Sequence, residues 1–325
     1  MLRTTTVGNY PKLPSEKGQV NIRKMLHRFD KNEVSRGELD AAYDAVTTRV
    51  IAEQASAGID LPTDGQIRWD DIVTPLAAGL DGFKVGGLLR WFDNNVYYRK
   101  PKIAGPILWK EPATAPNFQF AQQKSARPIK AVLPAPYSFA KLCDDQHYTS
   151  QAKLLADIGS ALRLEAQALI TAGAKHIQFD DPWLPYHHED AGVAIDALNT
   201  VVDGLEAEFW TCYYFSNIAK LAESLKQLQV SVIAADCVSH PGNVESLMGL
   251  SNKFICCFGI VDARNIKMER EDQLQTMLNR IAATAPNAYV SPSCGLEFLP
   301  HRDAVAKVQI LARAVKAFNG EPHHA

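Results

Sequence analysis

Thiol and carboxylate side chains close several β-rich segments of this 325-residue chain. Cys212 lies near the end of one such segment, Asp236 and Cys237 close the next, and Cys294 closes the last. Thiolates and carboxylates bind Zn²⁺, and a catalytic zinc keeps a fourth position open for water or substrate. None of the cysteines forms a CxxC pair, so the spacing alone does not predict zinc. If the segments are strands of one barrel, however, Cys212, Asp236 and Cys294 reach one face and could share a metal ion.

Two further segments end in residues that suit a binding site. The adjacent carboxylates Asp180 and Asp181 point to opposite sides of their strand, so one can face a barrel mouth while the other packs or caps a helix. Gly8 and Gly65 close the first two β-rich segments, and a glycine there allows the backbone to approach a ligand closely. An ordinary turn remains the alternative for both glycines.

The elements that would position these residues alternate between strand and helix patterns. Apolar residues spaced by three and four predict amphipathic helices over 38–57, 151–172 and 303–318. The predicted strands are 4–10, 60–65, 129–136, 176–182, 208–215, 230–237, 253–262 and 288–295. Eight alternating units favour a (β/α)₈ barrel over an open doubly wound sheet, because no GxGxxG follows the first strand.

The domain organisation follows from this pattern. We expect one α/β domain over residues 1–325, with an aromatic excursion over about 83–126 between the second and third strands and a disordered tail over about 320–325. Lys and Arg number 34 against 36 Asp and Glu, which argues against a nucleic-acid partner. No run is long enough to span a bilayer and no secretory signal is visible, so we expect no membrane partner. Six irregularly spaced cysteines indicate free thiols in a cytoplasmic protein.

Five motifs resemble those of one enzyme family. They are TTTVGNYP from residue 4, HIQFDDPWL from 176, TCY from 211, GIVD from 259 and SPSCGL from 291. Their sequence and order are similar to the C-terminal catalytic barrel of cobalamin-independent methionine synthase, from residue 4 to about 318. The chain begins directly at the first motif and so resembles the single-barrel members. The resemblance implies a zinc-dependent transfer of a methyl group to the thiol of homocysteine, which forms methionine.

The resemblance also implies the metal ligands. The family binds zinc through His, Cys, Glu and Cys, and Cys212 and Cys294 match the two cysteines. The carboxylate falls on Asp236 in one alignment and on Cys237 in another, and we favour Asp236 because a carboxylate is retained. Zinc would hold the homocysteine sulfur as a thiolate between Cys212 and Cys294, which makes both cysteines candidate catalytic residues.

The same resemblance implies the substrate contacts. Asp180 matches the Asp that holds the homocysteine ammonium group, and it is the third candidate catalytic residue. Gly8 and Asn9 match the backbone loop that meets the substrate carboxylate. Gln66 stands where the family has a Glu that also binds the ammonium group, with Asp64 close by as a substitute.

Three departures from the family pattern change these expectations. Trp210 replaces the zinc His and cannot bind metal, because its indole nitrogen only donates. His240 or Cys237 could supply the fourth zinc ligand, or the zinc site could have only three protein ligands. Leu142 replaces a Trp that stacks on the pterin, and Arg264 replaces a His that helps to protonate the departing folate. We therefore expect a methyl donor other than methyltetrahydrofolate, delivered by a small carrier or a companion protein.

Two other classes of function remain open on the sequence. One is a different reaction on a related barrel: methyl transfer to another thiol, or a metal-free decarboxylation. A decarboxylase would use clustered arginines, for which only Arg68 and Arg264 are candidates. The other is a non-catalytic barrel that binds homocysteine or methionine, against which the retained thiols and carboxylate argue.

Overall fold

Parallel strands form the centre of the molecule. The computed structural model describes residues 1–16, 18–94 and 96–320, and its largest sheet has the order β1-β12-β11-β10-β9-β8-β6. These strands are β1 (Arg3–Thr4), β6 (Lys130–Pro134), β8 (His176–Asp180), β9 (Glu208–Tyr213), β10 (Val232–Asp236), β11 (Ile255–Val261) and β12 (Tyr289–Pro292). All neighbours in this sheet pair in parallel.

The second predicted strand, 60–65, closes the ring between β1 and β6. Leu61 forms an isolated parallel bridge with Thr5, and its N–H donates to the carbonyl of Thr4 at 3.0 Å. On the other side the N–H of Lys130 donates to the carbonyl of Pro62 at 2.9 Å. Pro62 has no N–H to donate, which helps to limit this strand to a single bridge. The (β/α)₈ barrel predicted from the alternating pattern is confirmed.

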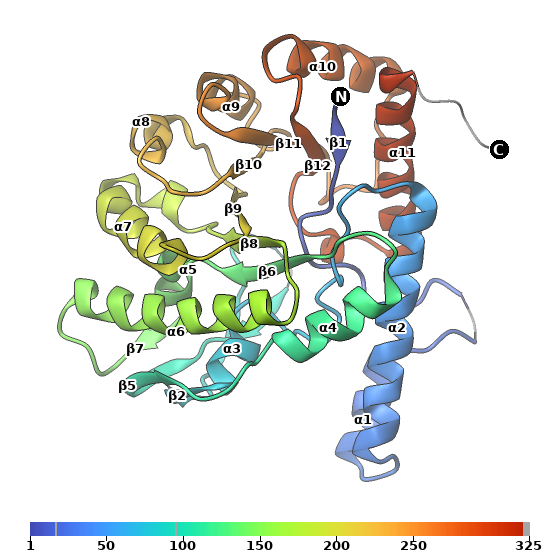
Figure 1. Cartoon of the computed structure of the whole chain (residues 1–325). Helices are drawn as coiled ribbons and strands as arrows, with labels where there is room; N and C mark the ends of the chain where they lie inside the picture. The colour runs from blue at the N-terminus through green and yellow to red at the C-terminus, as the bar shows by residue number, and fades with distance from the viewer. Residues whose placement is uncertain (17, 95, 321–325) are drawn as a thin grey trace.

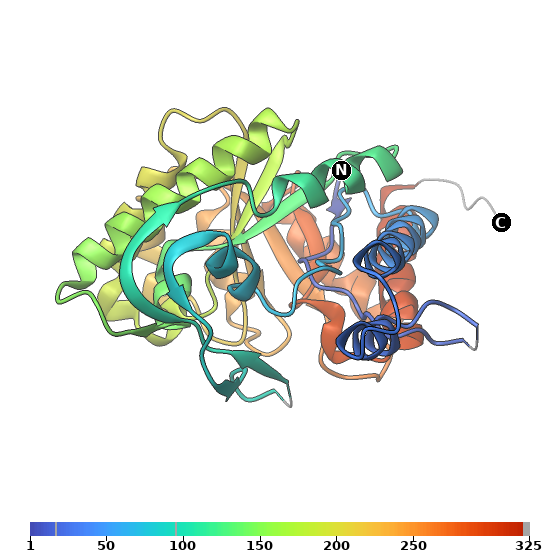
Figure 2. The ribbon, with the colours of Figure 1, turned by 90° about the horizontal axis from the view of Figure 1, so that it is seen from below.

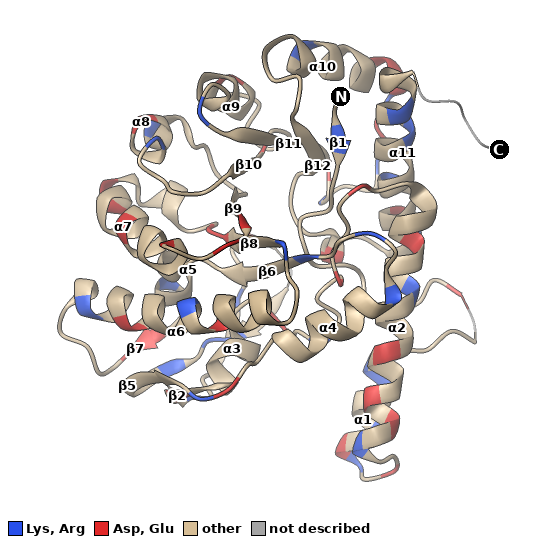
Figure 3. Cartoon of the chain, in the orientation of Figure 1, with Lys and Arg blue, Asp and Glu red and all other residues tan. Residues whose placement is uncertain are grey.

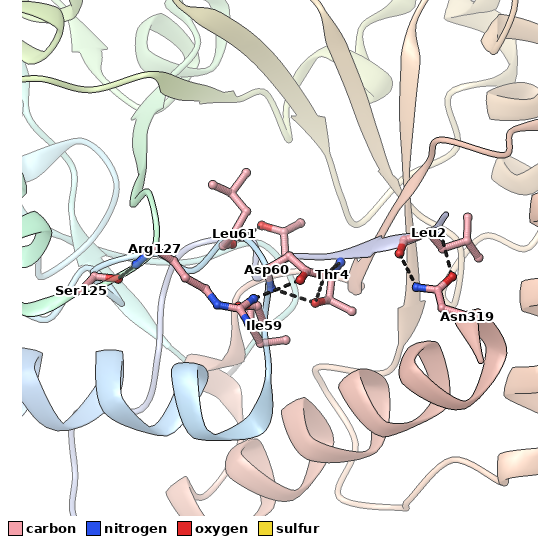
Figure 4. A network of polar contacts seen from close by, with 9 residues as sticks. Leu2, Thr4, Ile59, Asp60, Leu61, Ser125, Arg127 and Asn319 are labelled. Atoms are coloured by element: carbon pink, nitrogen blue, oxygen red, sulfur yellow. Dashed lines mark hydrogen bonds and ion pairs between the residues drawn. The ribbon is translucent and has the colours of Figure 1, made fainter. Parts of the chain in front are cut away.

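A polar network holds the outer end of this seam together (Figure 4). Asp60 accepts two hydrogen bonds of 2.8 Å from Thr4, through its N–H and its hydroxyl, and pairs with Arg127 at 3.0 Å. Leu2 and Asn319 exchange hydrogen bonds of 3.3 and 2.9 Å between the start of β1 and the last helix. The network therefore fixes the first strand to the second strand and to α11.

Helices surround the strands (Figure 1). They are α2 (Arg36–Ala57), α4 (Ala115–Lys124), α6 (Gln151–Thr171), α7 (Ala191–Val202), α8 (Ala222–Leu225), α9 (Asn243–Leu250), α10 (Glu271–Thr284) and α11 (His301–Asn319), with α1 (Ile22–Asp30) against α2. The predicted helices 38–57, 151–172 and 303–318 are confirmed as α2, α6 and α11. A capping box of Ser35 and Glu38 starts α2, and Gly58 at φ 94° ends it.

The predicted excursion lies between the second strand and β6. It contains α3 (Thr74–Ala78), β2 (Leu80–Lys84), β3 (Leu88–Arg90), β4 (Tyr97–Arg99) and β5 (Lys102–Trp109). β2 and β5 form a small sheet with β7 (Asp144–Asp145), which follows α5 (Pro136–Lys141), and β3 pairs with β4 in a hairpin. In Figure 2 this teal hairpin projects from the body of the barrel.

The excursion is shorter than the predicted range 83–126. Helix α4 contacts both α2 and α6 and so takes a place in the outer ring. Its polar sequence contains a narrow apolar stripe, because Ala115, Phe118 and Ala121 are buried while Gln119 and Gln123 are exposed. At the other end of the chain Gly320 caps α11 at φ 74°. The rest of the predicted tail, 321–325, lies outside the described residues.

The barrel interior is filled below the mouth. Side chains alternate in direction along a strand, so Trp210 lies one layer beneath Cys212 on β9. Its ring is 4.6 Å from that of Tyr289, across the interior. The ammonium group of Lys130 lies 4.5 Å above the Trp210 ring and donates to Gln178 Oε1 at 2.5 Å. Trp210 therefore occupies the packed interior beneath the open end.

Charges of both signs are mixed on the outside. Along α2 and α6, Lys and Arg alternate with Asp and Glu (Figure 3), consistent with the net charge of −2. Within the described residues, no helix is both long enough and apolar enough to cross a bilayer.

Candidate functional site

Asp180 ends β8 and points toward the end of β1. Gln178 Nε2 donates to Asp180 Oδ1 and to the carbonyl of Val7, both at 2.7 Å, and so joins the two strands through one amide. Tyr214 donates to Asp180 Oδ2 at 3.1 Å. Burial, with only 3% of the residue exposed, raises the pKa of Asp180 to about 7, while these hydrogen bonds and the charge of Lys130 act in the opposite direction. The carboxylate is thus oriented by donors and set at the barrel end.

Asp181 points the other way, as the alternation of the strand requires. Its Oδ1 accepts a hydrogen bond of 2.5 Å from the hydroxyl of Ser138 in α5, and that hydroxyl accepts from the N–H of Trp183 at 3.0 Å. Only 2% of Asp181 is exposed, and burial raises its pKa to about 7. Asp181 therefore fixes α5 to the strand end, whereas Asp180 faces the interior.

Gly8 and Gln66 meet at the ends of the first two strands. A Cβ on Gly8 would lie 2.7 Å from Gln66 Oε1, so only glycine leaves room for that amide. Gln66 is 1% exposed and adopts a left-handed backbone at φ 47°. Both its side-chain Oε1 and Nε2 are buried without a partner among the described residues. An orphaned buried amide is rare in native structures and indicates a position for a ligand.

Asp64, the predicted substitute for the family Glu, faces elsewhere. Its Oδ1 accepts a hydrogen bond of 2.9 Å from the N–H of Gln66 and closes a local turn. It lines a cavity of about 20 Å³ together with Phe118 of α4 and Leu169 of α6. That cavity lies between the strands and the outer helices. The structure therefore brings Gly8 and Gln66 together and leaves Asp64 on the far side of the second strand.

The three predicted metal ligands end neighbouring parts of the sheet. Cys212 lies on β9, Asp236 ends β10 and Cys294 follows β12. Burial raises the pKa of both thiols well above the ordinary value, and the charge of Asp236 adds to this effect at each of them. Within residues 1–16, 18–94 and 96–320, no three His, Cys, Asp or Glu side chains form a ready metal cluster. The candidate ligands thus interact through charge without being arranged around a common point.

Among the alternatives for the third and fourth ligands, Asp236 is the residue with an oxygen that has no hydrogen-bond partner in the described part of the chain. Its Oδ1 accepts from the N–H groups of Val238 and Ser239 at 2.9 Å, and its Oδ2 is buried without a partner among the described residues. The Cys237 thiol lies 3.4 Å from the carbonyl of Ala235 in its own strand. His240 Nε2 lies 3.1 Å from a backbone carbonyl, which requires that nitrogen to carry a proton.

Glu297 is a site residue that the sequence reasoning missed. It lies in a short 3-10 helix, η4 (Leu296–Phe298), three residues after Cys294. Burial raises its pKa to about 7, and its Oε2 has no partner in the described part of the chain. It lines a cavity of about 230 Å³ together with Asn9 and Lys12. A glutamate directly after the CGL motif was the available signal, because polar residues at strand ends face the barrel mouth.

The tip of the β3–β4 hairpin covers the mouth. Asp93 pairs with Arg264 at 2.9 Å, and the guanidinium lies 5.2 Å above the ring of Phe215. Phe92, held at φ 51°, packs its ring 4.8 Å from Trp183 and 5.1 Å from Phe215. The tip therefore contacts the loops that follow β8, β9 and β11.

The same excursion covers Leu142, the residue that the resemblance places at the expected pterin-stacking position. Tyr98 of β4 donates to the carbonyl of Leu142 at 3.1 Å, and Trp91 packs 5.4 Å from the Tyr98 ring. Leu142 is fully buried as a result. The side chain forms part of the packing between the excursion and α5 and presents no open surface.

Comparisons with known proteins identify the family and the fold. The model of the cobalamin-independent synthase catalytic domain matches residues 2–317. The methionine synthase of Saccharolobus solfataricus is 28% identical over 99% of this chain and 96% of its own, and that of Sulfolobus acidocaldarius is 28% identical over 95% and 89%. A B12-independent methionine synthase from Shewanella sp. W3-18-1, solved with selenomethionine, superposes with a TM-score of 0.85 at 21% identity over 98% of both chains. A putative vitamin-B12-independent methionine synthase from Listeria monocytogenes gives 0.76 at 16% identity, again over 98% of both chains. The chain belongs to the family of cobalamin-independent synthase catalytic domains.

Proposed function

We propose that this protein transfers a methyl group to the thiol of L-homocysteine and forms L-methionine. The observation that carries the proposal is the orientation of Asp180, a buried carboxylate that faces the barrel end beside Cys212. Family membership supports it, as do the relatives named methionine synthase and the selenomethionine complex of the Shewanella enzyme. A carboxylate at this place suits the ammonium group of an amino acid, because ion-assisted hydrogen bonds are the stronger class.

The donor set suits zinc. Two buried thiols and a carboxylate match the ligands that Zn²⁺ prefers, and the unpartnered Asp236 Oδ2 offers a lone pair that nothing else uses among the described residues. Cys212, Asp236 and Cys294 would hold the ion, with the fourth position left for substrate sulfur. A bound zinc would keep that sulfur as a thiolate at neutral pH, where a free thiol is mostly protonated.

The chain's own residues would bind and orient the substrate. Asp180 receives the ammonium group, and the backbone at Gly8 and Asn9 meets the carboxylate. The tip at Phe92 and Asp93 covers the mouth and excludes water. In the transfer itself the sulfur lone pair forms the new bond to the methyl carbon, and the donor keeps the electron pair of the bond that breaks.

We infer a methyl donor other than methyltetrahydrofolate. The stacking position holds Leu142, buried beneath Tyr98, so this position itself presents no aromatic face to a pterin. The acid position holds Arg264, which is paired with Asp93 and whose guanidinium does not release a proton in proteins. A folate donor needs both a flat surface and a proton for its leaving nitrogen. A smaller methyl carrier or a companion protein fits this mouth better.

The rival decarboxylase gains no support. Arg68 pairs with Asp40 at 2.8 Å and Asp44 at 2.6 Å on α2, so its guanidinium is occupied on the outer side. Arg264 is held by Asp93, as described above. All six cysteines are unpaired and buried, which suits a reducing compartment, and we propose that the protein acts in the cytoplasm.

A methyl-transfer assay tests the function. Zinc-loaded protein is incubated with homocysteine and either methyltetrahydrofolate, simpler methyl donors, or cell extract, and methionine is measured. We expect zinc-dependent methionine formation with a non-folate donor or with extract. No methionine under any condition, together with no bound zinc after purification, would favour a non-catalytic barrel.

A further inference from the structure

We propose that Glu297 supplies the second carboxylate that binds the substrate ammonium group, opposite Asp180. The inference deepens the proposed function and rests on it, because it concerns the same amino acid. It assigns a role to a residue that the family motifs leave unexplained.

The position of Glu297 is set by a sharp local fold. Its side chain turns back over Gly295, where a Cβ would lie 2.1 Å from Glu297 Oε2. In the same turn, the N–H of Leu296 donates to the carbonyl of Asn9 at 2.8 Å. The loop after β12 is thereby fixed to the loop after β1, where the substrate carboxylate would bind. Glu297 and Asn9 line the same cavity.

Glu297 also lies within reach of the charge on Asp180. The negative charge of Asp180 raises the pKa of Glu297, and both carboxylates raise the pKa of Tyr214. Tyr214 donates directly to Asp180. The two carboxylates therefore lie within electrostatic reach of each other and of the phenol of Tyr214. Two like charges at one buried place are unfavourable until a cation joins them.

A carboxylate is missing where the family would place one. Gln66 occupies that position and offers an amide oxygen, which accepts a hydrogen bond but carries no charge. Asp64 lines a different cavity, together with residues of α4 and α6. Glu297 is a carboxylate that lines the cavity shared with Asn9. It would therefore supply the negative charge that Gln66 lacks.

One oxygen of this carboxylate has no partner in the described protein. Its Oε2 is buried without a hydrogen-bond partner, although the backbone N–H of Glu297 donates to the group. The charge of Lys12 acts against the effect of burial on the pKa of Glu297, but the Lys12 ammonium donates to the carbonyl of Trp69, and no ion pair joins Lys12 to Glu297 in the described ranges. A buried carboxylate oxygen without a partner is costly, and a ligand cation would relieve that cost. An ammonium group has three N–H donors, which suits Asp180, Glu297 and the Gln66 oxygen together.

Binding of matched ligands tests the role. Calorimetry on zinc-loaded protein compares L-homocysteine with 4-mercaptobutanoate, which lacks only the amino group. We expect Glu297→Gln to weaken homocysteine about 10- to 100-fold while 4-mercaptobutanoate changes by less than about 2-fold, since a charged hydrogen bond is lost for one ligand only. Introducing Gln66→Glu into this variant returns a carboxylate to the family position and should restore most of the affinity. Glu297→Asp, which keeps the charge, should lose less.

The control is Glu269→Gln. Glu269 is another glutamate with a buried and unpartnered Oε2, but its Oε1 pairs with Lys307 of α11 at 2.8 Å and accepts from the N–H of Asp262 at 2.9 Å. Its variant should leave the affinity ratio of the two ligands unchanged, even if it lowers the free energy of unfolding.

Three results would overturn the proposal. They are an equal loss of affinity for both ligands, an unchanged affinity for homocysteine, and a loss of bound zinc in Glu297→Gln, which would make Glu297 a metal ligand. Failure of the wild-type protein to bind homocysteine would refute the proposed function instead. Tight binding without methyl transfer would refute the reaction and leave the role of Glu297 intact.

Discussion

The two adjacent aspartates at the end of β8 provide a matched pair for testing substrate recognition. Asp180→Asn keeps the shape of the side chain and retains an oxygen to accept the hydrogen bond from Gln178. It removes the charge that would meet the ammonium group. A hydrogen bond to a charged group contributes about 1.5–3 kcal/mol, so homocysteine affinity should fall about 10- to 150-fold. Titration calorimetry on zinc-loaded protein measures the change directly.

Asp181→Asn is the control. Asp181 is as buried as Asp180, but it accepts from Ser138 on the helix side of the strand. Its variant should lose stability without losing affinity for homocysteine. Urea unfolding of both variants separates the two effects. Equal affinities for the wild-type protein and Asp180→Asn would refute our reading of the site, as would a comparable loss in Asp181→Asn.

Three more predictions follow from the described contacts. Cys212→Ser and Cys294→Ser should each purify with less than half of the wild-type zinc, whereas Cys143→Ser, which changes a buried thiol outside the site, should keep it. Native mass spectrometry gives the zinc stoichiometry, and zinc retained in Cys212→Ser would count against the ligand set. The folded-state pKa of Asp181, about 7, lies above its ordinary value of 3.8, so the native state binds the proton more tightly and the free energy of unfolding falls as pH rises between these values. Asp181→Asn should make the free energy of unfolding depend less on pH in urea titrations at pH 4 to 7. An unchanged pH dependence would contradict the raised pKa of Asp181. Phe92→Ala removes the aromatic contacts with Trp91, Trp183, Tyr186 and Phe215. The loss of the contacts with Trp183 and Phe215 alone, at about 0.5–1.5 kcal/mol each, should accelerate amide exchange in β4 about 5- to 150-fold, whereas an unaltered rate would show that the Asp93–Arg264 pair alone holds the tip.

Much of the fold could be predicted because its signals are local. The stripe of Leu39, Ala42, Val46 and Val50 predicted α2, and all four residues are buried. The ends of the strands were equally clear from the sequence, since most of the predicted strands stop at a Gly, Pro, Asp or Cys. That is why Asp180 and Cys212 could be expected on neighbouring strands, where they are paired in register.

The rest depends on contacts between distant segments. No local pattern indicates that Tyr98 would cover Leu142, or that Asp93 would pair with Arg264 across 171 positions of sequence. Helix α4 was missed because its buried stripe is only three residues wide and is surrounded by glutamines. Glu297 was missed because its significance comes from the fold of Gly295 and from the absence of a partner among the described residues, and neither is visible in a motif.

The seam at the second strand has a consequence for how ligand binding affects the whole barrel. Between β1 and β6 the second strand is joined by one bridge at Leu61 and one backbone hydrogen bond from Lys130 to Pro62, and beyond its end the N–H of Tyr10 donates to the carbonyl of Gly65 at 2.9 Å. Regions with few backbone hydrogen bonds open locally at a lower free energy than the global unfolding reaction. Gln66 follows directly on this segment and faces the proposed substrate. Bound homocysteine would therefore stabilise the closed barrel at the strand that has the fewest backbone hydrogen bonds to its neighbours. At 100 times its Kd, a ligand that binds only the closed form adds about 2.7 kcal/mol to closure, and the amides around Leu61 should then become the best reporters of occupancy.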